Sequence, residues 1–190
     1  MPHISERGAA LPASPIRKLT PYDEAAKARG VKVYQLNIGQ PDLPTPEKAM
    51  EAIRSIDKRT LSYSMSQGTP ALREEFSKYY RTFGINLDPD EIIVTAGGSE
   101  ALLATFLTCF DPGDEVIITE PGYANYLSFA AAAGLVVKAV TSKIENGFAL
   151  PSAEDFKKAI TPRTKAILIC NPNNPTGYLY SPEELFQLRD

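Results

Sequence analysis

The sequence predicts an α/β fold in which a mostly parallel sheet is flanked by helices and preceded by an N-terminal arm. Short β-branched runs recur from residue 92 onward, and stretches with helical spacing lie between most of them. Strands that alternate with helices in this way are typical of a parallel sheet whose faces are covered by helices. A chain of 190 residues that is 43% hydrophobic is long enough to bury one substantial core.

The N-terminal arm is predicted from the first 21 residues, which carry four prolines without any period. A short helix over residues 23–29 follows and ends at Gly30, since glycine favours helix termination. Residues 33–38 predict a short extended segment. It leads into an irregular loop over residues 39–42, where glycine and proline disfavour regular structure.

Two threonine–proline pairs, Thr45-Pro46 and Thr69-Pro70, each predict a helix start. The threonine side chain can cap the helix, and proline is tolerated at the first helical position. The second of these helices is predicted to end at Gly84. It should be amphipathic because its apolar residues recur at helical spacing: Leu72, Phe76, Tyr79 and Phe83.

The later part of the chain predicts strands at four β-branched runs: residues 92–95, 116–119, 135–140 and 166–170. A final helix begins at Ser181, where serine, proline and two glutamates combine an N-cap with a capping box. The sequence ends at Asp190, about two turns into this helix, without a stop signal. We therefore expect the natural polypeptide to continue.

Charge and residue usage exclude several classes of protein. A net charge of -3 gives no basic surface for nucleic acid, and no apolar run is long enough for a secretory signal or a membrane span. Cys109 and Cys170 lie in separate apolar runs without a CxxC spacing, which predicts buried thiols and a cytoplasmic location. The only histidine, His3, lies in the arm, so Ser-His-Asp triads, Cys-His dyads and histidine-ligated zinc are excluded for this chain alone, and no metal site is predicted.

The first candidate ligand-binding motif is Gly97-Gly98-Ser99, between a predicted strand and a predicted helix. Such a turn directs free backbone N–H groups and the positive end of the helix dipole toward an anion. Gly98 permits close approach of a phosphate, and the Ser99 hydroxyl can donate one more hydrogen bond. The alternative is an ordinary turn in which Ser99 caps the helix, whereas dinucleotide-binding and P-loop spacings are absent.

Two further motifs follow later strands, at the edge where α/β sheets bind ligands. The rings of Tyr123 and Tyr126 could stack on a flat heteroaromatic cofactor, or they could pack into the core. Residues 171–177 contain three asparagines and two prolines, which predict a rigid loop whose amides can point at a ligand such as a phenolate oxygen. A plain turn is the alternative.

Residues 171–177 resemble the NPxNPTG motif of class I and II aminotransferases, which belong to fold type I of the pyridoxal 5'-phosphate (PLP) enzymes. The resemblance covers residues 14–190 and implies that residues 46–190 are the N-terminal part of the PLP-binding large domain, truncated at its C-terminus. Residues 1–45 would be the arm and a substrate loop. Other segments that resemble motifs of the family occur in the same order along the chain as in the family: Asn37–Asp42, Tyr63-Ser64 with Gly68 and Leu72-Arg73, Gly97–Leu102, and Pro121-Gly122-Tyr123.

The resemblance implies a role for each matching residue. The backbone of the turn would receive the PLP phosphate, an aromatic ring would stack on the pyridine, and an amide would bind the cofactor's 3' oxygen. Gly39, through a backbone N–H to the α-carboxylate, and Asn174 would contact the substrate. Tyr63 would reach the PLP of a neighbouring subunit, which implies a homodimer. The cofactor-binding residues would be Gly98, Ser99, Glu100, Tyr123, Asn174 and Tyr63.

The same resemblance implies that no catalytic residue lies in this chain. The family's Schiff-base lysine, the aspartate that pairs with the pyridine nitrogen and the arginine that binds the substrate carboxylate all lie beyond the NPxNPTG motif. Lys143 follows a serine, as the Schiff-base lysine can, but precedes the motif, and we interpret it as a solvated loop lysine.

The parent enzyme would transfer an amino group between an amino acid, with aspartate favoured, and a 2-oxo acid. This chain would supply the cofactor cradle. Two alternatives remain open: another fold type I enzyme, such as a lyase or a synthase, and a non-catalytic binding or assembly module. A transcription regulator is disfavoured because the arm has no room for a helix-turn-helix.

Overall fold

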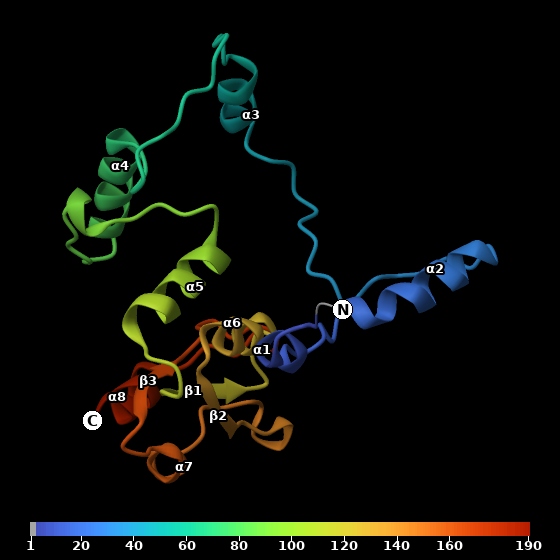
Figure 1. The fold of residues 1–190 in the computed structure, drawn as a ribbon, viewed down its shortest axis with the longest axis vertical. Coiled ribbons are helices and arrows are strands. Elements are labelled where there is room, and N and C mark those ends of the chain that lie inside the picture. The colour runs from blue at the N-terminus through green and yellow to red at the C-terminus, as the bar shows by residue number, and fades with distance from the viewer. Residues whose placement is uncertain (1–2) are drawn as a thin grey trace. The chain divides into compact units, whose positions relative to one another are not determined.

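The computed structural model describes residues 3–190, which form two compact units (Figure 1). One unit joins the segment that ends at Lys18 with Gly98–Asp190, and the other is Leu19–Gly97. The boundary at residue 45 that the sequence predicts stays a prediction. The helices of the first unit are α1 (Glu6–Ala10), α5 (Gly98–Cys109), α6 (Asn125–Ala133), α7 (Ala153–Ala159) and α8 (Pro182–Arg189), with a 3-10 turn η3 (Ile144–Asn146).

The first unit is built on a parallel sheet, which within the described residues has three strands in the order β2-β1-β3. The strands are β1 (Glu115–Glu120), β2 (Val136–Thr141) and β3 (Thr164–Leu168). The central strand β1 pairs with both neighbours and is buried from Glu115 to Thr119. The predicted α/β fold with a parallel sheet is therefore confirmed.

Helices cover both faces of this sheet because successive side chains of β1 point to opposite faces. On one face, Val116 and Ile118 pack in a cluster with Phe106 of α5 and residues of α6. On the other face, Ile117 packs with Phe156 of α7, and α8 adds an apolar side chain to that cluster. Helix α1 lies against α6, where the Arg7 guanidinium donates to a backbone carbonyl.

In the second unit, the helix predicted after Thr69-Pro70 forms as α4 and packs against η2. Arg73 of α4 is buried, and its Nη1 donates to Pro89 O at 2.8 Å and lies 3.0 Å from Asp90 Oδ1. The buried Ser77 hydroxyl donates to Leu87 O, so α4 is held against the segment that follows it. The helices here are α2 (Thr20–Ala28), α3 (Glu47–Arg54) and α4 (Pro70–Arg81), with 3-10 turns η1 (Arg17–Leu19) and η2 (Pro89–Glu91).

The prediction of a strand at residues 92–95 is wrong. This segment is extended at Ile92, but no strand pairs with it among the described residues. Val94 N donates to Gln67 O at 3.0 Å, and Ile93 is 72% exposed. A β-branched run becomes a strand only where a neighbouring backbone completes its ladder, and the sequence pattern does not reveal that neighbour.

Three smaller predictions are also corrected. Residues 33–38 are not extended throughout, because a turn forms at Leu36 and Asn37. Pro46 rather than Thr45 occupies the N-cap of α3, with no side-chain cap. Cys109 is exposed at the end of α5 and Cys170 is only partly buried, although both are free thiols. An apolar local sequence predicts burial only when a packing partner covers it.

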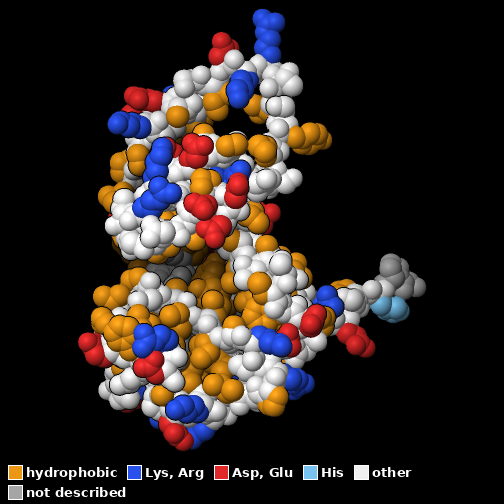
Figure 2. Space-filling model, turned by 90° about the vertical axis from the view of Figure 1, so that its left-hand side faces the viewer, with side chains coloured by type: hydrophobic (Ala, Val, Ile, Leu, Met, Phe, Trp, Pro, Cys, Tyr) orange, Lys and Arg blue, Asp and Glu red, His pale blue; other side chains and the backbone are white. Residues whose placement is uncertain are grey.

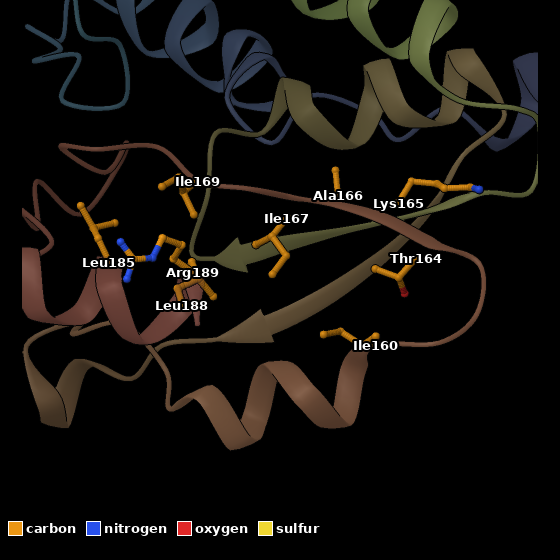
Figure 3. A pocket seen from close by; sticks show the side chains of 9 residues that line it. All are labelled: Ile160, Thr164, Lys165, Ala166, Ile167, Ile169, Leu185, Leu188 and Arg189. Carbon is orange, nitrogen blue, oxygen red and sulfur yellow. The ribbon is translucent and has the colours of Figure 1, made fainter. Parts of the chain in front are cut away.

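Large apolar side chains remain exposed on both units (Figure 2). A pocket of ≈ 670 Å³ lies along the outer side of β3 in the first unit. Figure 3 shows its walls, which include Ile167 of β3, Ile169 just after that strand, and Leu185 and Leu188 of α8. The described residues place no further strand beside β3, so this edge keeps unpaired backbone groups.

The buried carboxylate of Glu115 links the amino ends of the three strands. Its Oε2 accepts from the Thr161 hydroxyl at 2.6 Å and the Thr164 hydroxyl at 3.2 Å, and its Oε1 lies 3.2 Å from Arg163 Nη2 and 3.6 Å from Lys138 Nζ. The Thr161 hydrogen bond, aided by Thr164 and the two cations, holds the pKa of Glu115 below its ordinary value despite its burial.

This lowered pKa predicts a loss of stability in acid. The unfolded chain binds the proton first, so the contribution of Glu115 is complete above its unfolded pKa of about 4.3 and declines as the pH falls below it. Denaturant unfolding at several pH values should show a steeper decline below pH ~4.3 for the wild type than for Glu115→Gln. Glu145→Gln, which changes an exposed carboxylate without an ion pair in the described chain, should keep the wild-type slope. Equal slopes for wild type and Glu115→Gln would contradict the assignment.

Candidate cofactor site

The chain topology brings the candidate residues of the first unit to one edge of the sheet. Helix α5 ends at Cys109 and β1 begins at Glu115, so the C-terminal end of α5 lies near the amino end of β1. A helix of 12 residues is about 18 Å long, close to the length of a six-residue strand. Leu102 and Phe106 of α5 both pack on the cluster that contains Val116 and Ile118 of β1, so α5 lies along that strand. Its N-terminus therefore points toward the carboxyl edge, where the loops after β1 and β3 also emerge.

The N-terminus of α5, where the sequence predicts an anion cradle, is exposed. Gly97 has φ 140, a conformation that side chains rarely adopt, and the Thr95 hydroxyl donates to its carbonyl at 2.9 Å. A Cβ added at Gly98 would meet no described atom within 4 Å beyond its chain neighbours and the backbone of its own helix. Ser99 is exposed and is the second residue of the helix, so the alternative in which it caps the helix is not supported.

The two tyrosines that follow β1, Tyr123 and Tyr126, have different environments. Tyr126 lies on α6 and packs against the core cluster, and burial, together with the neighbouring Cys170, raises its pKa to about 12. Tyr123 stands edge-on to it, with ring centroids 5.3 Å apart and an interplanar angle of 83°. The Asn125 amide donates to the Tyr123 hydroxyl at 2.7 Å. Tyr126 therefore follows the core alternative, and the partly exposed Tyr123 is the ring available to a ligand.

The three asparagines of the loop after β3 have different environments. Asn171 Oδ1 accepts from Tyr180 N at 2.9 Å. Asn173 is only 6% exposed, and its amide donates to Pro121 O and to Thr176 Oγ1. Asn174 is exposed, and its side chain makes no hydrogen bond to the described residues. The expectation that all the amides can point at a ligand is thus corrected, because two of them hold the loop.

The hydrogen bond from Asn173 to Pro121 joins the two loops directly, across 52 positions of sequence. Gly122, next to Pro121, has no space for a side chain, since an added Cβ would lie 2.7 Å from Thr119 O. No structural role was predicted from the sequence for Asn173 or for Gly122. The family resemblance includes Gly122 in Pro121-Gly122-Tyr123 and assigns the cofactor contact to Asn174, but it does not predict that Asn173 is buried.

The remaining predicted residues lie elsewhere. Gly39 and Tyr63 belong to the second unit, so their relation to Asn174 stays a prediction. Tyr63 is fully exposed, and Gly39 lies in an exposed loop. Glu100 follows Ser99 in the first turn of α5, and Lys143 is exposed in a loop, as predicted.

Two further features are absent from the part of the chain that the structure describes. Over residues 3–190, none of the helices has both the length and the apolar character needed to span a bilayer. The same residues contain no group of three or more His, Cys, Asp or Glu side chains that could hold a metal ion.

Comparison with known proteins identifies the family. The model of aminotransferase class I and II matches residues 31–190, and the chain belongs to this family, whose members are PLP-dependent enzymes of fold type I. The predicted resemblance is thus confirmed. The chain spans about half the length of the curated relatives it matches.

Individual relatives share both sequence and fold with the chain. It is 42% identical to the aspartate/prephenate aminotransferase of Thermus thermophilus over 84% of this chain and 42% of that protein. The aspartate aminotransferase of Geobacillus stearothermophilus is 39% identical over 96% of this chain and 47% of its own length. The Thermus thermophilus aspartate aminotransferase structure with maleate superposes with a TM-score of 0.90 at 38% identity, over 99% of this chain and 50% of that one.

A structure with a different named substrate superposes equally well. The alanine aminotransferase of Pyrococcus furiosus has a TM-score of 0.90 and 34% identity, over 98% of this chain and 48% of that one. The fold of this chain is therefore shared by aminotransferases that are named for different substrates.

Proposed function

We propose that the carboxyl edge of the sheet binds PLP and that the full-length protein is an aminotransferase. The observation that carries this proposal is the joining of the Tyr123 loop to the Asn174 loop through Asn173, at the edge that the N-terminus of α5 also faces. These elements offer an aromatic face, a free amide and backbone N–H groups.

The donor set at this edge fits PLP. Backbone N–H groups at Gly98, Ser99 and Glu100, with the positive helix end, suit a phosphate dianion. The partly exposed ring of Tyr123 can stack on a pyridine, and its hydroxyl is held by the Asn125 amide. The Asn174 amide has no partner among the described residues and can donate to the 3' oxygen. PLP supplies an electron sink for transfer of the amino group, while the protein residues bind and orient it.

Aspartate and a 2-oxo acid are the substrates that we propose. The names of the Thermus and Geobacillus relatives support aspartate, and the Thermus structure with maleate shows that protein with a dicarboxylate. Gly39 would donate a backbone N–H to the substrate α-carboxylate, and Asn174 would also contact the substrate. We further propose a homodimer in which Tyr63 reaches the partner's cofactor, and a cytoplasmic location, which the two free thiols support.

Product analysis of the full-length protein tests the reaction. Incubation with PLP, aspartate and 2-oxoglutarate should yield glutamate and oxaloacetate in equal amounts. Alanine in place of aspartate should react more slowly. Formation of ammonia or a cleaved side chain would instead indicate a lyase, and absence of both turnover and PLP uptake would favour a non-catalytic module.

Asn174→Ala should raise the pH at which the visible spectrum of the bound cofactor changes, by about one unit. The amide donor stabilises the deprotonated 3' oxygen, so its removal favours the protonated form. A spectroscopic pH titration of the full-length protein measures this. Asn146→Ala, at an exposed asparagine without a side-chain hydrogen bond in the described chain, serves as the control. An unchanged or lowered transition would remove Asn174 from the site.

A further inference from the structure

Asn173 forms the centre of the loop after β3. Its Nδ2 donates to Pro121 O at 3.0 Å and to Thr176 Oγ1 at 2.8 Å. Its backbone N–H donates to Tyr178 O at 2.8 Å, and its backbone carbonyl accepts from Gly177 N at 2.7 Å. One residue therefore closes its own loop and ties that loop to the one that follows β1.

Each end of this connection is fixed close to a residue proposed to hold the cofactor. Pro121 is two residues before Tyr123, and the intervening Gly122 is packed against the carbonyl of Thr119. At the other end, Asn174 is the next residue in the chain and is exposed. The position of the Asn174 amide relative to the Tyr123 ring thus depends on the hydrogen bonds of Asn173.

The buried side chain of Asn173 carries an energetic cost that its two donated hydrogen bonds must offset. Its Oδ1 is buried and accepts no hydrogen bond from the described residues. A buried oxygen without a donor costs about 1–3 kcal/mol, and a leucine of similar size would avoid that cost. The two hydrogen bonds that Nδ2 donates explain why an amide stands here.

We propose that Asn173 is a positioning residue that sets the Asn174 amide at the right place relative to the Tyr123 ring. The proposal rests on the proposed function, since it assumes that both residues contact PLP. Because Asn173 is buried and its amide is engaged by Pro121 and Thr176, it would act through its neighbours. Its removal should therefore alter both the coupling between the loops and the spectrum of the bound cofactor.

The coupling is tested without any cofactor, by hydrogen exchange of the full-length protein. In Asn173→Leu, backbone exchange over residues 121–126 should rise by about tenfold, as expected when one hydrogen bond no longer restrains the segment. Asn174→Ala should leave that segment unchanged. Asn173→Gln, which keeps an amide donor, should restore part of the protection and provides a second variant if the leucine variant does not fold. Unchanged exchange in both Asn173 variants would overturn the coupling.

The positioning role is tested with PLP bound. Asn173→Leu should raise the pH of the spectral transition, as Asn174→Ala does, and the double variant should shift no further than Asn174→Ala alone. Ser152→Ala, which removes the N-cap of α7, lowers stability but should change neither readout. Increased exchange with an unshifted spectrum, or additive shifts, would overturn the positioning role. A wild type that takes up no PLP would overturn the proposed function, while the exchange experiment would still decide the coupling.

Discussion

Gly122→Ala should lower the free energy of unfolding by about 1–3 kcal/mol, the usual cost of forcing extra atoms into a packed site. The added Cβ would lie 2.7 Å from Thr119 O, which is backbone of the buried central strand and cannot rotate away. The loop must shift instead, and Tyr123 shifts with it. Denaturant unfolding of the full-length protein measures the stability, and PLP titration measures the accompanying loss of affinity.

Gly98→Ala provides the matched comparison, because the same methyl group is added in open space. Beyond the chain neighbours and the backbone of α5 itself, no described atom lies within 4 Å of that Cβ, and the backbone of Gly98 is not in the left-handed region. Stability should be unchanged or slightly raised, since alanine favours a helix more than glycine does. The PLP dissociation constant should nevertheless rise by about tenfold, as expected if close approach of the phosphate is lost. Loss of stability with unchanged affinity would contradict the cradle.

Mixing two inactive variants of the full-length protein should restore activity if Tyr63 reaches the partner's cofactor. One variant is Tyr63→Ala, and the other lacks the lysine that anchors PLP. Each hybrid dimer contains one site with both groups intact, so random subunit exchange should recover about a quarter of the wild-type activity of a two-fold dimer. The full exposure of Tyr63 leaves its ring available for such a contact.

Subunit exchange must be verified, and a second tyrosine variant controls for loss of an exposed ring. Tyr22→Ala changes an exposed tyrosine of α2 that has no proposed role, and its homodimer should stay active. No recovery in verified hybrids would show that Tyr63 acts within its own subunit or not at all. A monomeric full-length protein would contradict the shared site altogether.

The sequence alone determined the local structure that depends on neighbouring residues. The capping box at Ser181 and Glu184 forms as predicted, because both of its hydrogen bonds lie within one helical turn. The helix at Thr69-Pro70 and the runs that became β1, β2 and β3 were also predictable, since period and propensity are local properties. The NPxNPTG motif gave the family, which the comparisons confirmed.

Only the tertiary structure decided which residues have partners distant in sequence. The run at residues 92–95 looked like the other strands, yet no strand pairs with it in the described chain. Asn173 and Asn174 are chemically identical neighbours, but a carbonyl at Pro121 engages one and leaves the other exposed. Glu115 is buried because Thr161, Thr164 and two cations surround it. A sequence fixes the chemistry of each side chain, whereas burial and hydrogen bonding depend on groups that folding brings from far along the chain.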